Sequence, residues 1–131
     1  MLLLGADCNG DRDSLLRAYD DREGVTAAFD LNVLAHLNRS RGATFDLDAF
    51  MHRAIWNAAR SRIEMHLVSK RKQTVRLGDA LIDFERGEPI VTEHCYKHSA
   101  SSIAAMLEDA GWQLARVEHD SAARMHLWLA R

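Results

Sequence analysis

The sequence has 131 residues, of which 47% are hydrophobic, and its formal net charge is −2 at pH 7. This composition predicts one soluble domain with its own core and argues against nucleic-acid binding, for which an excess of clustered lysine and arginine is typical. The first apolar run, Met1–Leu4, is shorter than a signal-peptide core of about 7 residues or a membrane span of about 20, so we expect a cytoplasmic protein without membrane partners.

The first predicted element is a short buried strand over residues 2–7, LLLGAD. Residues 11–22 follow as a helix, because apolar and aromatic side chains recur there at helical spacing: Leu15, Leu16 and Tyr19. A second helix is predicted over residues 25–41 and ends at Gly42. This helix is the clearest element, since an apolar side chain occupies every fourth position: Val25, Phe29, Val33 and Leu37.

The periodicity then changes from helical to alternating, which indicates β structure. Polar and apolar side chains alternate over residues 62–67, as a half-buried strand requires, and residues 51–57 are the predicted hairpin partner. A second hairpin is predicted from residues 73–77 and 80–84, and a further strand from residues 90–96. An antiparallel sheet is the expected product.

The end of the chain returns to helix and then to strand. Ser99 or Ser101 can begin a helix that Gly111 ends, with one apolar stripe formed by Ile103, Met106, Leu107 and Ala110. Two strands, over residues 112–119 and 125–131, close the chain. The predicted fold class is therefore α+β, with antiparallel strands.

The glycines are scattered singly, at positions 5, 10, 24, 42, 78, 87 and 111. No two are close enough for a GxG loop or a Walker A loop, so the sequence predicts no nucleotide cradle. The motifs GxSxG, HExxH and CxxC are also absent. No motif of the sequence therefore indicates catalysis.

Residues 92–99, TEHCYKHS, concentrate reactive side chains and allow three interpretations. A metal site is one, because Glu93, His94, Cys95 and His98 are zinc ligand types, but a strand points His94 and Cys95 to opposite faces and no second ligand pair has typical spacing. We expect no metal. A polar strand with surface histidines is the second interpretation. The third is a pocket wall, in which Glu93 and Cys95 share one face.

Three stretches in this order resemble the histidine-specific, S-adenosylmethionine (SAM)-dependent Nα-methyltransferases of the ergothioneine pathway: AYDDREGVTAAFDLNVLAHLNR, FDLDAFMHRAIWNAARSRIEMHLVS and TEHCYKHS. In that family a Rossmann-like domain binds SAM, and a second domain, inserted after the fifth strand, completes the amino-acid pocket. The resemblance covers nearly the whole chain. It implies an antiparallel substrate domain with helices, joined to remnant strands and a helix of the Rossmann-like domain.

The resemblance also implies domain boundaries. Residues 1–7 resemble the fifth strand of the methyltransferase domain, residues 8–99 the substrate-recognition domain, and residues 100–131 the final helix and strand pair of the methyltransferase domain. SAM is the family's cofactor, as the resemblance implies. The family's glycine-rich cofactor loop has no counterpart here, so we do not expect this chain alone to bind SAM.

Five substrate-binding residues carry over from the family. Tyr19 in AYDD corresponds to a tyrosine that holds the substrate carboxylate, and Thr26 in GVTA to a threonine at the same pocket. Met65 in RIEM corresponds to a methionine beside the imidazole, although periodicity alone makes it a core methionine. Glu93 corresponds to the glutamate that accepts the imidazole N–H, and Cys95 stands where the family has serine.

Two departures from the family pattern affect this assignment. An imidazole presents two nitrogens and needs two partners, and the Cys95 thiol is a weaker hydrogen-bond donor than a hydroxyl. Asp30 in FDLN replaces an asparagine of the relatives, and nothing in the sequence explains the change.

The function expected from these observations is the substrate-recognition half of a histidine Nα-methyltransferase-like protein, without a catalytic side chain of its own and inactive alone. The alternative is a non-catalytic amino-acid-binding or interaction module. In either case histidine is the favoured ligand, and the expected partner is a separate cofactor domain or a second copy of the chain.

Overall fold

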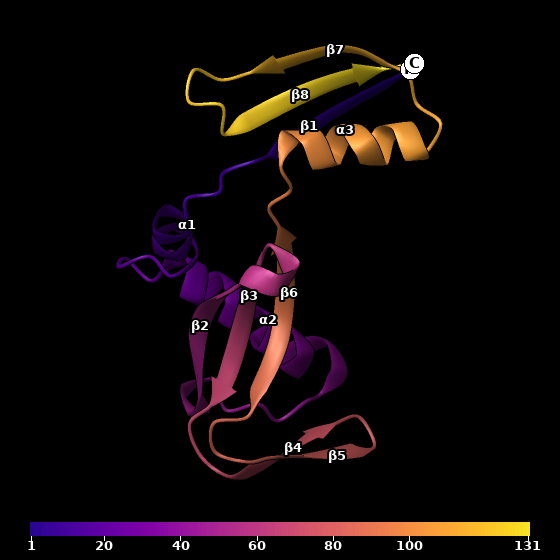
Figure 1. Ribbon diagram of the computed structural model, residues 1–131. Coiled ribbons are helices and arrows are strands. Elements are labelled where there is room, and N and C mark those ends of the chain that lie inside the picture. The colour runs from indigo at the N-terminus through magenta and orange to yellow at the C-terminus, as the bar shows by residue number, and fades with distance from the viewer.

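Two three-stranded antiparallel sheets and a separate hairpin form the β structure of the chain, and three α-helices lie against them (Figure 1). The computed structural model describes residues 1–131. The prediction of an α+β fold with antiparallel strands is confirmed. The assignment of any strand to a Rossmann-like domain stays a prediction, as do the domain boundaries at residues 7 and 99.

The first sheet joins the two ends of the chain. Its strand order is β1 (Leu2–Asp7), β8 (Met125–Ala130) and β7 (Leu114–His119). Helix α3 (Ala100–Asp109) lies along one face, where Ile103 and Leu107 pack with Trp128 into a small core. Ser99 begins this helix, because its hydroxyl accepts a hydrogen bond from the N–H of Ser102.

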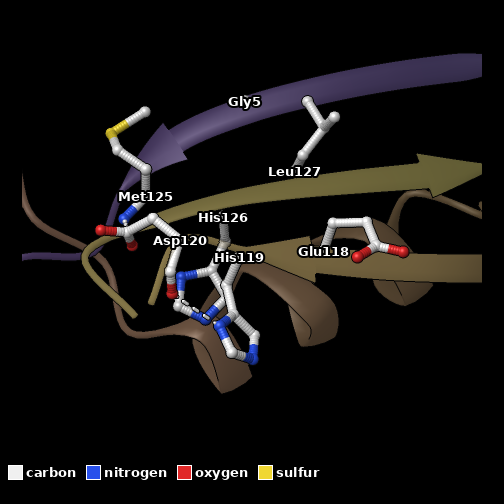
Figure 2. Close-up of a pocket in the computed structure, with 7 residues that line it drawn as sticks. All are labelled: Gly5, Glu118, His119, Asp120, Met125, His126 and Leu127. Carbon is white, nitrogen blue, oxygen red and sulfur yellow. Dashed lines mark hydrogen bonds between the residues drawn. The ribbon is translucent and has the colours of Figure 1, made fainter. Parts of the chain in front are cut away.

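A hollow of about 240 Å³ lies at the β7–β8 turn of the first sheet (Figure 2). His126 is one of its lining residues and stacks on Trp128, with the ring centroids 5.3 Å apart. The buried Nδ1 atom of His126 has no hydrogen-bond partner. Leu3 is 63% exposed, so β1 is a strand as predicted but buries only one of its faces.

The second sheet has the order β2 (Phe50–Asn57), β3 (Arg62–Ser69) and β6 (Pro89–Tyr96). The hairpin of β4 (Gln73–Leu77) and β5 (Ala80–Phe84) extends from it, and two short 3-10 helices, η1 (Leu47–Ala49) and η2 (Ala58–Arg60), flank β2. The main core lies between this sheet, the hairpin and helix α2, and its buried side chains are Leu34, Ala43, Phe45, Ala49, Phe50, Leu67, Val75 and Phe84.

Helices α1 (Arg12–Tyr19) and α2 (Val25–Arg41) form where the sequence predicts them, and Gly42 ends α2 in the left-handed conformation. The buried face of α2 is not the face formed by the apolar residues at every fourth position. Val25 and Phe29 are 69% and 68% exposed, whereas Asp30 and Leu34 are 3% and 1% exposed. The helix turns this second stripe toward the core because Leu31, Leu34 and Leu37 supply enough apolar surface there.

Two segments connect the sheets, one from β1 to α1 and one from β6 to α3 (Figure 1). An ion pair joins them, with Lys97 Nζ 2.6 Å from Asp7 Oδ2. This contact closes a loop of ninety sequence positions and fixes the two segments against each other. None of the three helices has the length and hydropathy of a membrane-spanning helix.

The start of α2 depends on the carboxylate of Asp21. It accepts hydrogen bonds from the backbone N–H groups of Val25 (2.9 Å) and Thr26 (2.8 Å), because Gly24, the N-cap residue, has no side chain to do so. Hydrogen bonds from the side chain and backbone of Thr26, and then from Val25, lower the pKa of Asp21 to about 2.

We predict that this contact makes stability depend on pH in acid. The folded-state pKa lies below the ordinary value of 3.8, so the stabilisation is present above that value and is lost as pH falls toward 2. The free energy of unfolding should therefore fall more steeply between pH 4 and 2 in the wild type than in Asp21→Asn, as measured by urea denaturation. Asp20→Asn, at the exposed neighbouring carboxylate, is the control and should follow the wild type. Equal slopes for wild type and Asp21→Asn would contradict the prediction.

Candidate functional site

Strand β6 divides its side chains between the two faces of the second sheet. Cys95 lies on the face that carries the helices, since its Sγ atom accepts a hydrogen bond from the Tyr19 hydroxyl of α1 at 2.9 Å. Glu93 lies on the same face and lines a cavity against α2. Alternation therefore places the carboxylate and the thiol together on the helix side.

The Glu93 cavity has a volume of about 350 Å³ and lies between α2 and β6. Its lining is mixed, with two carboxylates, an amide, an imidazole and a hydroxyl beside two apolar side chains: Phe29, Asp30, Asn32, Val33, His36, Thr92 and Glu93. A polar cavity of this size with a few converging hydrogen-bonding groups is suited to a small molecule.

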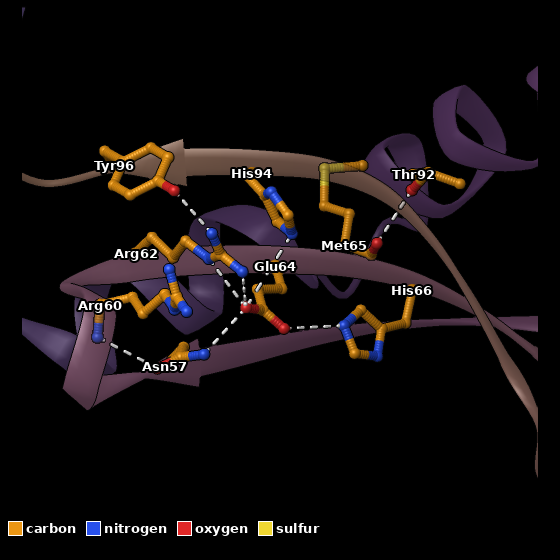
Figure 3. Close-up of polar contacts among 9 residues, drawn as sticks. All are labelled: Asn57, Arg60, Arg62, Glu64, Met65, His66, Thr92, His94 and Tyr96. Carbon is orange, nitrogen blue, oxygen red and sulfur yellow. Dashed lines mark hydrogen bonds and ion pairs between the residues drawn. The ribbon is translucent and has the colours of Figure 1, made fainter.

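A β-bulge shapes the wall of this cavity. Pairing of β6 with β3 shifts between Met65 and His66, so Met65 opposes Glu93 while His66 opposes Val91. Thr92 is the extra residue, and its hydroxyl donates to the carbonyl oxygen of Met65 at 3.0 Å (Figure 3). Bulges often redirect neighbouring side chains at functional sites. Glu93 is the residue that directly follows this bulge in β6.

An apolar cavity of about 400 Å³ adjoins the first, because Val33 and Thr92 line both. Its other walls come from α2, the β4–β5 hairpin and the start of β6. The Glu93 cavity therefore has an apolar neighbour on the side of the hairpin.

The Tyr19–Cys95 contact belongs to a buried polar cluster. The side chain of Lys97 is only 4% exposed, and its Nζ atom lies near three acceptors: Asp7 Oδ2 (2.6 Å), the Tyr19 hydroxyl oxygen (3.1 Å) and Cys95 Sγ (3.3 Å). Burial opposes the charge of Lys97, but these hydrogen bonds outweigh it and raise the pKa of the ammonium. Lys97 is therefore charged at every physiological pH.

The pKa of the Tyr19 phenol is also raised. Burial is the main cause, and the hydrogen bond to Cys95 adds to it, while Lys97 acts in the opposite direction. Tyr19 is thus a protonated hydrogen-bond donor at neutral pH.

The five carried-over residues do not all line one cavity. Tyr19 and Cys95 are in direct contact, whereas Glu93 alone of the five lines the cavity against α2. Thr26 lies at the junction of α1 and α2, where its hydroxyl is 3.3 Å from the carbonyl oxygen of Ala18. Met65 is 3% exposed, the burial that its strand periodicity predicts. Their roles in substrate binding stay a prediction.

Lys97 and Asp7 are not among the site residues predicted from the sequence. One signal for Lys97 was present, because Glu93, Cys95 and Lys97 continue the same two-residue alternation. Asp7 had no local signal, since its partner lies ninety positions away.

Asp30, for which the sequence offered no explanation, has a clear structural role. Its Oδ2 atom is 2.8 Å from Nδ1 of His52, whose Nε2 atom is 2.7 Å from the backbone carbonyl oxygen of Tyr19. The two side chains are 2% and 1% exposed. Both ring nitrogens lie within hydrogen-bond distance of an oxygen atom, so the ring has a partner at each end. This pair fixes the end of α1, and with it Tyr19, to α2 and β2.

The outer face of the second sheet holds a different polar network (Figure 3). Glu64 is the centre, with Arg62, Asn57 and His66 donating to its carboxylate. Hydrogen bonds from Arg62 and Asn57 lower the pKa of Glu64 to about 2. His94 lies at the edge of this network, with its Nε2 atom 4.0 Å from Glu64. His94 and Cys95 therefore have separate surroundings on opposite faces.

Comparison with known proteins identifies the family. A family model described as "Histidine-specific methyltransferase, SAM-dependent" matches residues 1–131. The chain belongs to this family. The resemblance inferred from the sequence is thereby confirmed.

Relatives of this histidine-specific methyltransferase family extend beyond the chain. A "Histidine N-alpha-methyltransferase" of Mycobacterium tuberculosis is 47% identical over 131 residues, and its namesake in Mycolicibacterium smegmatis is 46% identical; each match covers 98% of this chain and 41% of the relative. "Ergothioneine biosynthesis protein 1" of Schizosaccharomyces pombe is 25% identical over 114 residues, 86% of this chain and 15% of that protein. The chain thus spans less than half the length of the relatives it matches.

The buried Asp30–His52 pair gives a stability prediction. Asp30→Ala leaves a buried nitrogen of the His52 ring without a hydrogen-bond partner and should lower the free energy of unfolding by about 1–3 kcal/mol. Asp30→Asn should cost about 1 kcal/mol, because an amide can donate to Nδ1 of a neutral ring. Urea denaturation measures both, with Asp109→Ala at an exposed position of α3 as control. A loss in Asp30→Ala no larger than in this control would show that the pair does not hold the fold.

Proposed function

We propose that the chain provides the amino-acid side of a histidine Nα-methylation site of the ergothioneine pathway, and that SAM is bound by protein outside residues 1–131. The observation that carries this proposal is the position of Glu93. Its carboxylate lines a 350 Å³ cavity on the sheet face where Tyr19 contacts Cys95, in a chain that belongs to a histidine-specific methyltransferase family.

The residues of the chain can bind the two ends of a histidine molecule. A carboxylate in a partly apolar cavity accepts a charge-assisted hydrogen bond from an imidazole N–H, which favours this ring over an indole or a phenol. The Tyr19 hydroxyl is a donor fixed at the end of α1, and it would bind the substrate carboxylate. Holding both ends orients the α-amine between them, which is catalysis by positioning.

The residues present do not fit SAM itself. The loop between β1 and α1 leads from a strand to a helix, but it offers no free helix N-terminus to a cofactor, because the N-terminus of α1 is already capped. The Asp11 carboxylate accepts from the N–H groups of Asp13 and Ser14, which leaves a negatively charged loop with occupied donors. In the family SAM supplies the methyl group, and here that part of the reaction is assigned to protein outside the chain.

The proposal requires a partner, either a separately encoded cofactor domain or the remaining part of a longer protein. Exposed apolar side chains on the first sheet offer surface for it or for a second copy of the chain, among them Leu3, Met125 and Leu127. A non-catalytic amino-acid-binding module would use the same cavity without methyl transfer.

We predict that Glu93 contributes more to substrate binding than Cys95 does. In protein restored by co-expression with the part of a mycobacterial relative that this chain does not cover, Glu93→Ala should weaken histidine binding by about 1.5–3 kcal/mol, roughly 10- to 150-fold. Cys95→Ala should cost less, and Cys95→Ser should tighten binding because a hydroxyl is a better donor than a thiol. Calorimetric affinities for histidine, tryptophan and tyrosine across these variants provide the measurement.

The control for Glu93→Ala is Glu108→Ala, which removes an exposed carboxylate from α3 and should leave affinity unchanged. An unaltered preference for histidine in Glu93→Ala would show that Glu93 does not bind the imidazole, and the substrate assignment would be wrong.

A second prediction concerns the cofactor. The chain alone should show no stoichiometric SAM binding by titration calorimetry, because it lacks a glycine-rich loop and its β1–α1 loop is acidic. S-adenosylhomocysteine, which lacks the positive sulfonium charge, serves as a control for non-specific attraction to acidic surface. Tight one-to-one binding of both compounds would place the cofactor site inside residues 1–131.

A further inference from the structure

Lys97 is a buried cation in the segment that connects β6 to α3, between the two sheets. It follows β6 directly, its side chain is 4% exposed, and its backbone N–H donates to the carbonyl oxygen of Ser61 at 2.8 Å. A buried ammonium is costly unless every proton has an acceptor. Three acceptors surround it, and each comes from a different segment of the fold: Asp7 from β1, Tyr19 from α1 and Cys95 from β6.

The number of protons fixes the direction of these hydrogen bonds. An ammonium group has three donors and no acceptor, so Lys97 donates to the Tyr19 oxygen and to Cys95 Sγ. The oxygen of Tyr19 is therefore occupied as an acceptor, and its single proton must point elsewhere. It points to Cys95 Sγ at 2.9 Å, a weak acceptor that a carboxylate can displace at little cost.

The geometry points to Lys97 as a positioning residue that holds the Tyr19 hydroxyl as a hydrogen-bond donor, directed to Cys95 in the free protein and to the carboxylate of the amino-acid substrate in the complex. This inference deepens the proposed function and rests on it for the identity of the ligand. Asp7 completes the arrangement, because its carboxylate balances the charge of Lys97 and fixes the ammonium from the side of β1.

One feature makes Lys97 more than a structural contact. Its positive charge lies 3.1 Å from the Tyr19 oxygen, so it acts on the phenol directly and lowers the pKa that burial and Cys95 raise. A lysine that only joined two segments would not affect this pKa.

The first test measures the ionisation of Tyr19 in the chain as it exists. The chain has two tyrosines, so Tyr96→Phe leaves Tyr19 as the only phenol, and its midpoint follows from absorbance near 295 nm against pH. Lys97→Met should raise this midpoint by about 1 unit or more, whereas Cys95→Ala should lower it. An unchanged midpoint in Lys97→Met overturns the inference. Lys97→Gln, which also removes the charge, replaces Lys97→Met if circular dichroism shows that the latter is unfolded.

The second test asks whether the effect reaches a carboxylate ligand, in protein restored with the uncovered part of a relative. Histamine is histidine without the carboxylate. Lys97→Met should weaken histidine binding at least about 10-fold while histamine affinity changes less than about 2-fold. Equal losses for both ligands would overturn the role toward the carboxylate. Failure of the wild type to bind histidine would refute the proposed function alone, because the Tyr19 titration tests Lys97 without any ligand.

Discussion

The alternation of side chains along β6 is the constraint on which the candidate site depends. The sheet of β2, β3 and β6 has helices α1 and α2 on one face only. Every second residue of the chain from Glu93 onward therefore points toward these helices. Glu93 lines the cavity, Cys95 meets Tyr19, and Lys97 reaches across to β1. A shift of register by one residue would turn all three outward and leave the site without its polar groups.

Burial restricts the geometry of the polar groups around Tyr19. Lys97 and the Asp30–His52 pair are polar groups inside the molecule, and both contact Tyr19, one through the hydroxyl and the other through the backbone carbonyl. Such groups favour the geometry that gives each of them a partner, because an unpaired polar group in the interior is costly. The tyrosine is thus held at both ends, which is how a hydrogen-bond donor is fixed before a ligand arrives.

Local patterns in the sequence predicted the elements well and the contacts between them poorly. Local patterns predicted all eight β-strands and all three α-helices but neither of the two 3-10 helices, because alternation and helical spacing depend on residues only two to four positions apart. The buried face of α2 was not the one with the regular apolar repeat, since the choice between Phe29 and Asp30 depends on the distant partner His52. Lys97 and Asp7, ninety positions apart, could be joined only by the fold. Family resemblance supplied Tyr19 and Glu93 as candidates, but not the contacts that hold them.

The most direct test of the account is methyl transfer by the restored protein. The chain would be co-expressed with the part of the Mycobacterium tuberculosis relative that it does not cover, and the purified complex incubated with histidine and SAM carrying a labelled methyl group. The account predicts label on the α-nitrogen of histidine, identified by mass spectrometry, and none when either part is omitted. A stable complex that binds SAM but labels neither histidine nor any other amino acid would contradict it.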